Sequence, residues 1–401
     1  MKWCFLCILL FSCHGDFANE TSNNSGIKRV EDGSRFTEKD EPIDIVSTDR
    51  SKNKNSISLT LIGEISSPII SGDTLQATNI VLRGEKAFIG YNVKGDTFKG
   101  AADIIKLNKL ISKGTVEYLS SVYFERSDVN CIEESGGKVY FALASDEGEF
   151  SDQAIAGYIR LKGNTFDLSD TKFVGLKGYA ANSIHISGSS LLVTTGSNGG
   201  LYKLDKTSLE QESMIEIPYA RWVDAKSNAI VLVSGGTTKG KLYFFENNSI
   251  SAPVDSVEFS GSTQDQAKST VKIAKEKIIV ATNEGGIKVF DHASRVAVGE
   301  QAQIKLDGIS SEKTVTNAVD GVSKYIYASN GEAGIYVYSV SPELKSKSTQ
   351  TITFTQLGYL RFGESISANH IVYNSKFILV AAGKGGVKIL SVDDDDDEED
   401  D

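Results

Sequence analysis

Short apolar runs separated by glycine-rich turns recur along most of the chain. In "ANHIVYNSKFILVAAGKGGVKIL", a polar residue begins one run, a second run follows, and a Gly-Gly turn leads to a third. Short apolar runs bounded by turn residues favour β-strands, and no stretch with helical periodicity interrupts them. The same arrangement of three runs occurs seven times.

Each repeat begins with a polar residue, and the residue nine positions later is an apolar residue of the second run, as Asn369 is followed by Ile378. These starting residues are Asn79, Asn130, Asn182, Arg221, Ser269, Asn317 and Asn369. They lie 39 to 52 residues apart, and self-similarity at such a period in short strands is typical of a β-propeller. A fourth, more irregular strand follows the other three, as in "QTITFTQL". We therefore predict an all-β chain folded as a seven-bladed β-propeller with four-stranded blades.

The seventh repeat stops after its third strand, at "VKILSV". The segment Ser56–Ser66, "SISLTLIGEIS", alternates apolar and polar residues and precedes the first repeat. We expect this N-terminal strand to supply the missing fourth strand, because pairing the two ends removes open sheet edges. The propeller is therefore predicted to span residues 56–392.

The N-terminus has the features of an export signal. Lys2 precedes an apolar run from Trp3 to Phe11 that is too short to span a bilayer. The following Leu10-Phe11-Ser12-Cys13 resembles the lipobox of bacterial lipoproteins, which implies cleavage after residue 12 and acylation of Cys13. The alternative is an ordinary secretory signal cut elsewhere. Residues 13–55 are mostly polar, which predicts a flexible tether.

Charge narrows the classes of partner. The formal net charge is −11, and the acidic run at residues 393–401 supplies nine of those negatives, so the rest is nearly balanced. Nucleic-acid binding needs a basic face, and no such face is indicated. Blocks of like charge are typically disordered, so residues 393–401 are predicted to be a solvated acidic tail. We also expect a monomer.

Metal-binding and catalytic signatures are few. The mature chain would keep Cys131 without a partner cysteine, which favours a small buried hydrophobe. His185 and His370 fall in first strands, where they serve either as ordinary strand residues or as channel-facing metal ligands. The loop with Asp146, Glu147, Glu149 and Asp152 is either solvated or a weak calcium site. We predict no cofactor, and no G-x-S-x-G, H-E-x-x-H or P-loop motif occurs.

The seven starting residues form the candidate ligand site. In a propeller the first strand is innermost, so their side chains are expected to ring one mouth of the central channel. Arg221, beside Trp222 and Tyr219, adds a guanidinium suited to a carboxylate or phosphate. The alternative is structural: the asparagines cap turns by bonding nearby backbone groups, and Arg221 pairs with a loop carboxylate.

Three turn-and-strand segments resemble the LVIVD-repeat propellers: "GGLYKLD" (Gly199–Asp205), "GGIKVFD" (Gly285–Asp291) and "GIYVYSVSP" (Gly334–Pro342). Together with the lipobox, this resemblance implies a lipid-anchored propeller of the bacterial envelope, placed at the outer membrane. We expect a binding or scaffolding module for a protein or glycan partner. The alternative is a hydrolase or lactonase with a metal in the central channel, and fold alone does not decide between them.

Overall fold

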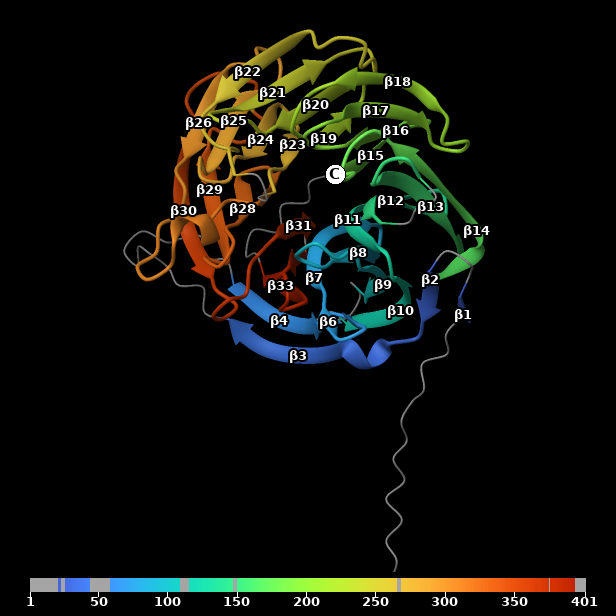
Figure 1. The fold of residues 1–401 in the computed structure, drawn as a ribbon. Helices are drawn as coiled ribbons and strands as arrows, with labels where there is room; N and C mark the ends of the chain where they lie inside the picture. Colours follow the sequence, from blue (N-terminus) through green and yellow to red (C-terminus); the bar gives the residue numbers. More distant parts are fainter. Residues whose placement is uncertain are drawn as a thin grey trace, which may run out of the picture.

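The computed structural model describes residues 21–22, 26–43, 58–108, 115–146, 150–264, 268–374 and 376–393. In this part of the chain, seven antiparallel sheets surround a central axis (Figure 1). The predicted all-β, seven-bladed propeller is therefore confirmed.

The first three blades follow one another in sequence, each running from the channel outwards. Blade 1 contains β7 (Gln76–Arg83), β8 (Lys86–Asn92), β9 (Gly100–Asn108) and β10 (Thr115–Phe124). Blade 2 contains β11 (Ser127–Ser135), β12 (Lys138–Ser145), β13 (Ala154–Lys162) and β14 (Thr165–Leu176). Blade 3 contains β15 (Ser183–Ser187), β16 (Ser190–Thr194), β17 (Gly200–Asp205) and β18 (Gln211–Glu216).

The next three blades repeat this order. Blade 4 contains β19 (Ala220–Lys226), β20 (Ala229–Ser234), β21 (Gly240–Phe245) and β22 (Asp255–Phe259). Blade 5 contains β23 (Val271–Ala274), β24 (Lys277–Ala281), β25 (Ile287–Asp291) and β26 (Ala297–Gln301). Blade 6 contains β27 (Ala318–Val322), β28 (Tyr325–Ser329), β29 (Ile335–Ser341) and β30 (Thr353–Leu360), and the short 3₁₀ turn η2 (Ser311–Lys313) precedes it.

Blade 7 is built from both ends of the chain. It takes β31 (His370–Asn374), β32 (Phe377–Ala381) and β33 (Val387–Asp393) from the C-terminal part and β4 (Ser58–Ile65) from the N-terminal part. β4 pairs antiparallel with β33, from the Val387–Ile65 pair to the Asp393–Ser58 pair. The predicted closure by the N-terminal strand is therefore confirmed, and it brings blue and red segments together in Figure 1.

The N-terminal stretch differs from the sequence-based expectation of a tether over residues 13–55. β2 (Ile27–Val30) adds to the outer strand β10 of blade 1, and β3 (Phe36–Ile43) adds to β4 of blade 7. The two-residue strand β1 (Thr21–Ser22) pairs with β2, and the 3₁₀ turn η1 (Gly33–Arg35) connects β2 to β3. We call residues 26–43 the strap, because they cross the seam where the ring closes.

The strap is fixed at η1 by one arginine. The Arg35 guanidinium donates to Asp103 Oδ1 at 2.6 Å, to Ser66 O at 2.8 Å and to Asp32 Oδ2 at 2.9 Å. Asp103 lies on β9 and is only 1% exposed. A polar composition concealed these strands, because pairing at a sheet edge needs mainly backbone hydrogen bonds and only a few apolar side chains.

The core lies between the blades. Each of seven clusters of buried apolar side chains is shared by two neighbouring blades. In β12, Phe141 and Leu143 pack towards blade 1, whereas Tyr140 and Ala142 pack towards blade 3. Since successive side chains of a strand point to opposite faces, a strand buried on both sides is mainly apolar along its whole length. This explains the continuous runs that mark the second strand of each repeat.

Several predictions lie outside the described residues. They concern the signal peptide at residues 1–12, the acylated Cys13 and the acidic tail beyond Asp393. Among the described residues, no helix is long and apolar enough to cross a membrane.

A small hairpin of β5 (Ile69–Ile70) and β6 (Asp73–Thr74) connects the closing strand to blade 1.

Candidate functional site

Residues that start five of the innermost strands tie their blade to the next one. Their side chains contact the backbone carbonyl of the residue just before the next blade's starting residue, at 3.0 to 3.1 Å. The pairs are Thr78 to Val129, Asn130 to Ala181, Asn182 to Ala220, Asn317 to Ala368 and Asn369 to Ala77. We call this set of contacts the belt. These side chains bond backbone groups, as in the structural alternative, but the groups belong to the neighbouring blade and not to a nearby turn.

In blade 1 the belt position is Thr78 and not Asn79. The hairpin of β7 and β8 ends at the Arg83–Lys86 pair, and the hairpin of β11 and β12 ends at the Ser135–Lys138 pair. Thr78 precedes Arg83 by the same number of residues as Asn130 precedes Ser135, so Thr78 and Asn130 are equivalent positions. Asn79 lies one position further along and is 3% exposed. Its Oδ1 accepts the N–H of Ile132 at 2.9 Å, and its amide contacts His370 Nε2 at 3.4 Å.

Arg221 replaces the usual belt contact between blades 4 and 5. Its Nη1 donates to Asn283 Oδ1 at 2.7 Å and to Ser269 Oγ at 3.2 Å, and its Nη2 donates to Gln264 O at 2.7 Å. A Cβ on Gly235 would collide with the guanidinium, so a larger residue there would force Arg221 to shift. Arg221 is thus held in place by the fold.

A cavity of about 830 Å³ opens over this mouth of the channel. Five of the predicted site residues line it. They are Asn130, Asn182, Arg221, Trp222 and Ser269. The structure does not bring Asn317 or Asn369 to its wall, because the cavity lies over blades 1 to 5 and not over the whole ring. Asn79 is also absent from the wall, because its side chain is buried against Ile132 and His370.

Four aromatic side chains line the cavity: Phe98, Tyr179, Tyr219 and Trp222. Phe98 and Tyr179 come from loops of different blades, with ring centroids 6.0 Å apart. Tyr179 is 55% exposed and Tyr219 38% exposed, which makes them two of the most exposed large apolar side chains in the described part of the chain. Tyr219 also has a φ of 58°, a backbone conformation that is costly for a bulky residue.

Asp128 is a buried carboxylate in the cavity wall. Its Oδ1 accepts the backbone N–H groups of Val93 and Lys99, each at 3.1 Å, and so holds the long loop of blade 1 that carries Phe98. The side chain is 8% exposed. Burial raises the pKa of Asp128 to about 7, although the two N–H donors partly oppose the shift. Sequence reasoning missed Asp128, because it lies inside a strand and matches no motif.

Lys268 is the second charged residue that sequence reasoning missed. Its Nζ donates to Thr78 O at 2.6 Å and lies 4.8 Å from the centre of the Trp222 ring. Burial lowers the pKa of Lys268 to about 8. Its position directly before the starting residue Ser269 was the only feature of the sequence that could have identified Lys268. Titratable groups with shifted pKa values in a cleft are candidates for function.

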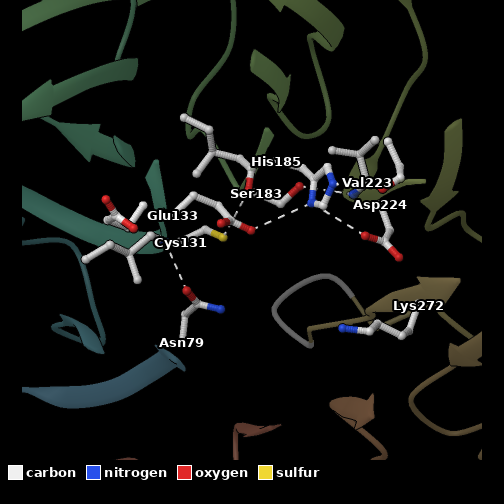
Figure 2. A network of polar contacts seen from close by, with 12 residues as sticks. Asn79, Cys131, Glu133, Ser183, His185, Val223, Asp224 and Lys272 are labelled. Atoms are coloured by element: carbon white, nitrogen blue, oxygen red, sulfur yellow. Dashed lines mark hydrogen bonds and ion pairs between the residues drawn. The ribbon is translucent and has the colours of Figure 1, made fainter. Parts of the chain in front are cut away.

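Deeper in the channel, a second set of polar residues connects the first strands (Figure 2). His185 Nδ1 lies 3.4 Å from Asp224 Oδ1 and 3.7 Å from Glu133 Oε1. The Nε2 of His185 donates to Ala225 O at 3.1 Å. Burial raises the pKa of Glu133, although His185 and Arg83 oppose the shift.

The histidines do not converge on one site. His185 belongs to the network of Figure 2, whereas the ring of His370 packs 5.6 Å from the ring of Trp222. Among the described residues, no three His, Cys, Asp or Glu side chains are grouped so that they could hold a metal ion. Cys131 is 2% exposed within the core between blades 2 and 3, as expected for a buried hydrophobe.

The predicted calcium loop is only partly described. Asp146 pairs with Arg126 at 3.1 Å, and both side chains are more than half exposed. Glu147 and Glu149 lie outside the described residues. The calcium prediction therefore remains a prediction.

No protein-family model matches the sequence, and no curated protein matches it. Solved structures match the fold. A Bacteroides fragilis protein proposed to be a 6-phosphogluconolactonase is 16% identical, with a TM-score of 0.56 over 82% of this chain and 96% of that chain. The WD40 repeats of RRP9 are 10% identical, with a TM-score of 0.54 over 82% and 98%. BamB from Moraxella catarrhalis is 12% identical, with a TM-score of 0.49 over 89% and 97%.

At such low identity, the likeness to the first two structures shows the propeller fold alone. Propellers support unrelated binding and catalytic roles, so function must be argued from the cavity.

Proposed function

We propose that this chain is an envelope lipoprotein whose propeller is a binding module. The observation that carries the proposal is the cavity over the channel mouth, where exposed aromatic side chains lie beside buried polar groups on a rigid ring. Concave sites with apolar surfaces and a few converging polar groups are where ligands usually bind. The belt beneath the cavity supports preorganisation, since it fixes the lining strands to one another.

The aromatic residues are the expected anchors for the partner. Tyr and Trp give large contact areas at low cost in side-chain entropy, and they dominate many binding sites. Tyr219 and Trp222 lie on either side of Arg221, so the turn into blade 4 presents both rings to the cavity. We propose that this turn is the centre of the binding site for a protein or glycan partner.

We further propose that Cys13 is acylated and holds the propeller at the outer membrane. The lipobox-like Leu10-Phe11-Ser12-Cys13 supports this proposal, as does the resemblance of the blades to LVIVD repeats. Mass spectrometry of the mature N-terminus tests it directly. We expect an acylated Cys13, and a Cys13→Ala chain that still fractionates with membranes would refute the anchor.

Binding is tested by incubating the full chain with isolated envelope material and measuring the fraction retained. Tyr219→Ala should lower retention about tenfold or more, as is common for a central aromatic anchor. Val254→Ala is the matched control, because Val254 is 50% exposed and lies beside the outermost strand of blade 4. Equal retention of all three proteins would contradict the proposal. Hydrolysis dependent on a channel metal would favour the enzyme alternative.

A further inference from the structure

The lining of the cavity has an unusual mixture of side chains. Beside the four aromatic residues it contains several amides and hydroxyls. None of the described residues that line it is Leu, Ile, Val or Met. A lipid chain or an apolar peptide side chain would meet few aliphatic surfaces there. A sugar ring suits the site better, because its C–H faces pack on aromatic rings while its hydroxyls bond polar groups.

Two oxygen acceptors in the wall are available to a ligand. Asp128 Oδ1 is occupied by two backbone N–H groups, but no described residue donates to Oδ2. The amide of Asn182 donates to Ala220 O, and no described residue donates to its Oδ1. A polar side chain as buried as Asp128 normally has its hydrogen-bonding capacity used. These oxygens are therefore suited to accept hydroxyl protons from a bound sugar.

Lys268 indicates a negative charge on the ligand. Its ammonium contacts a backbone carbonyl and the face of Trp222. No described carboxylate pairs with it. The groups facing it are the Cys131 thiol and the His370 imidazole, and neither supplies a countercharge in its neutral form. A partly buried cation without a counterion is costly, and an anionic ligand group would remove that cost.

We propose that the cavity binds a saccharide that carries a carboxylate. A sugar ring packs on Tyr219 and Trp222, its hydroxyls donate to Asp128 and Asn182, and its carboxylate pairs with Lys268. This inference rests on the proposed binding function and specifies its ligand class. Arg221 positions the strand that carries Trp222 and is not assigned a ligand contact.

The test is a glycan array probed with the full chain, followed by calorimetry. The array carries hexuronic-acid oligosaccharides, sialylated oligosaccharides and the corresponding neutral oligosaccharides. We expect the chain to bind carboxylated glycans at least tenfold more tightly than their neutral counterparts. Lys268→Gln keeps a donor for Thr78 O but removes the charge. It should lower affinity for the carboxylated glycan about ten- to a hundredfold and leave affinity for the neutral one unchanged.

Lys239→Gln is the matched control, since Lys239 is a 60% exposed lysine that pairs with Glu258 and does not line the cavity. Its affinities should equal those of the unmodified chain. Equal binding of neutral and carboxylated glycans, or an unchanged preference in Lys268→Gln, would overturn the role of Lys268. If no glycan binds while Tyr219→Ala still abolishes retention on envelope material, the saccharide proposal fails and the binding function stands.

Discussion

Two roles are open to Arg221, one in ligand binding and one in stabilising the fold. The sequence makes Arg221 a candidate cation of the ligand site. The structure gives its guanidinium three contacts across the junction of blades 4 and 5, to Ser269, Asn283 and Gln264. These contacts belong to the fold, so loss of the guanidinium should lower the stability of the protein.

We therefore predict that Arg221→Lys destabilises the protein by about 2–3 kcal/mol, because one ammonium cannot reproduce the three charge-assisted contacts. Denaturant unfolding measures the change. Arg126→Lys is the control, since the Arg126–Asp146 pair is exposed and should contribute less than about 1 kcal/mol. A loss no larger than that of the control would show that Arg221 is not a structural residue.

His370 makes stability depend on pH. Burial, with help from Lys268 and Lys272, lowers its pKa well below the usual value. The folded protein therefore keeps His370 neutral at pH values where the unfolded chain, with a pKa of about 6.5, binds a proton. This contribution is complete above about pH 6.5 and decreases as the pH falls, by up to about 1.4 kcal/mol per pH unit.

The free energy of unfolding, measured from pH 8 to pH 5, should thus decline less steeply for His370→Gln than for the unmodified chain. Identical slopes for the two proteins would mean that His370 becomes protonated without cost in the folded state.

At the scale of the element, the strap and the closing strand hold the seam between blades 1 and 7. Arg35 links η1 to Asp103, whose carboxylate is nearly inaccessible. Arg35→Ala would leave a buried unpaired charge, so we predict a loss of about 3–5 kcal/mol in the free energy of unfolding. Lys39→Ala on the neighbouring strand β3 removes outer pairs with Glu41 and Glu64, which are screened by solvent, and should cost much less. Equal small losses would show that Arg35 does not fasten the strap.

The closing strand should matter more than any single residue. Deleting residues 56–66 removes β4, which pairs with both β33 and β3. Blade 7 would then expose a sheet edge, and apolar residues such as Ile62 and Leu59 would be lost from two interblade clusters. We predict loss of a single cooperative unfolding transition, measured by circular dichroism. An unchanged transition would contradict closure at this strand.

The sequence predicts those elements whose pattern follows from burial. The second strand of each repeat is mainly apolar because both of its faces are covered, and β4 was identified by its alternation. β2 and β3 were missed because a strand added at an outer edge needs few apolar residues. The asparagines of the belt were singled out from the sequence as a ligand ring or as turn caps, and not as contacts between blades. The displacement from Asn79 to Thr78 depends on the hairpin register, which periodicity alone does not fix.

At the scale of the whole molecule, the candidate site is less predictable than the fold. Asn130, Asn182 and Trp222 were expected at the channel mouth and do line the cavity. Asp128 and Lys268 become prominent only when the ring is closed, since residues far apart in the chain then face one space. Loop residues such as Tyr179 carry no periodic signal at all.

The central claim is that the partner binds in the cavity over the channel mouth. The most direct test places a photoreactive amino acid at Tyr219 or at Val254 in the full chain and irradiates intact cells. We predict a light-dependent adduct from position 219, inside the cavity, and none from position 254, beside the outer edge of blade 4. Adducts from position 254 alone, or equally from both positions, would contradict the claim.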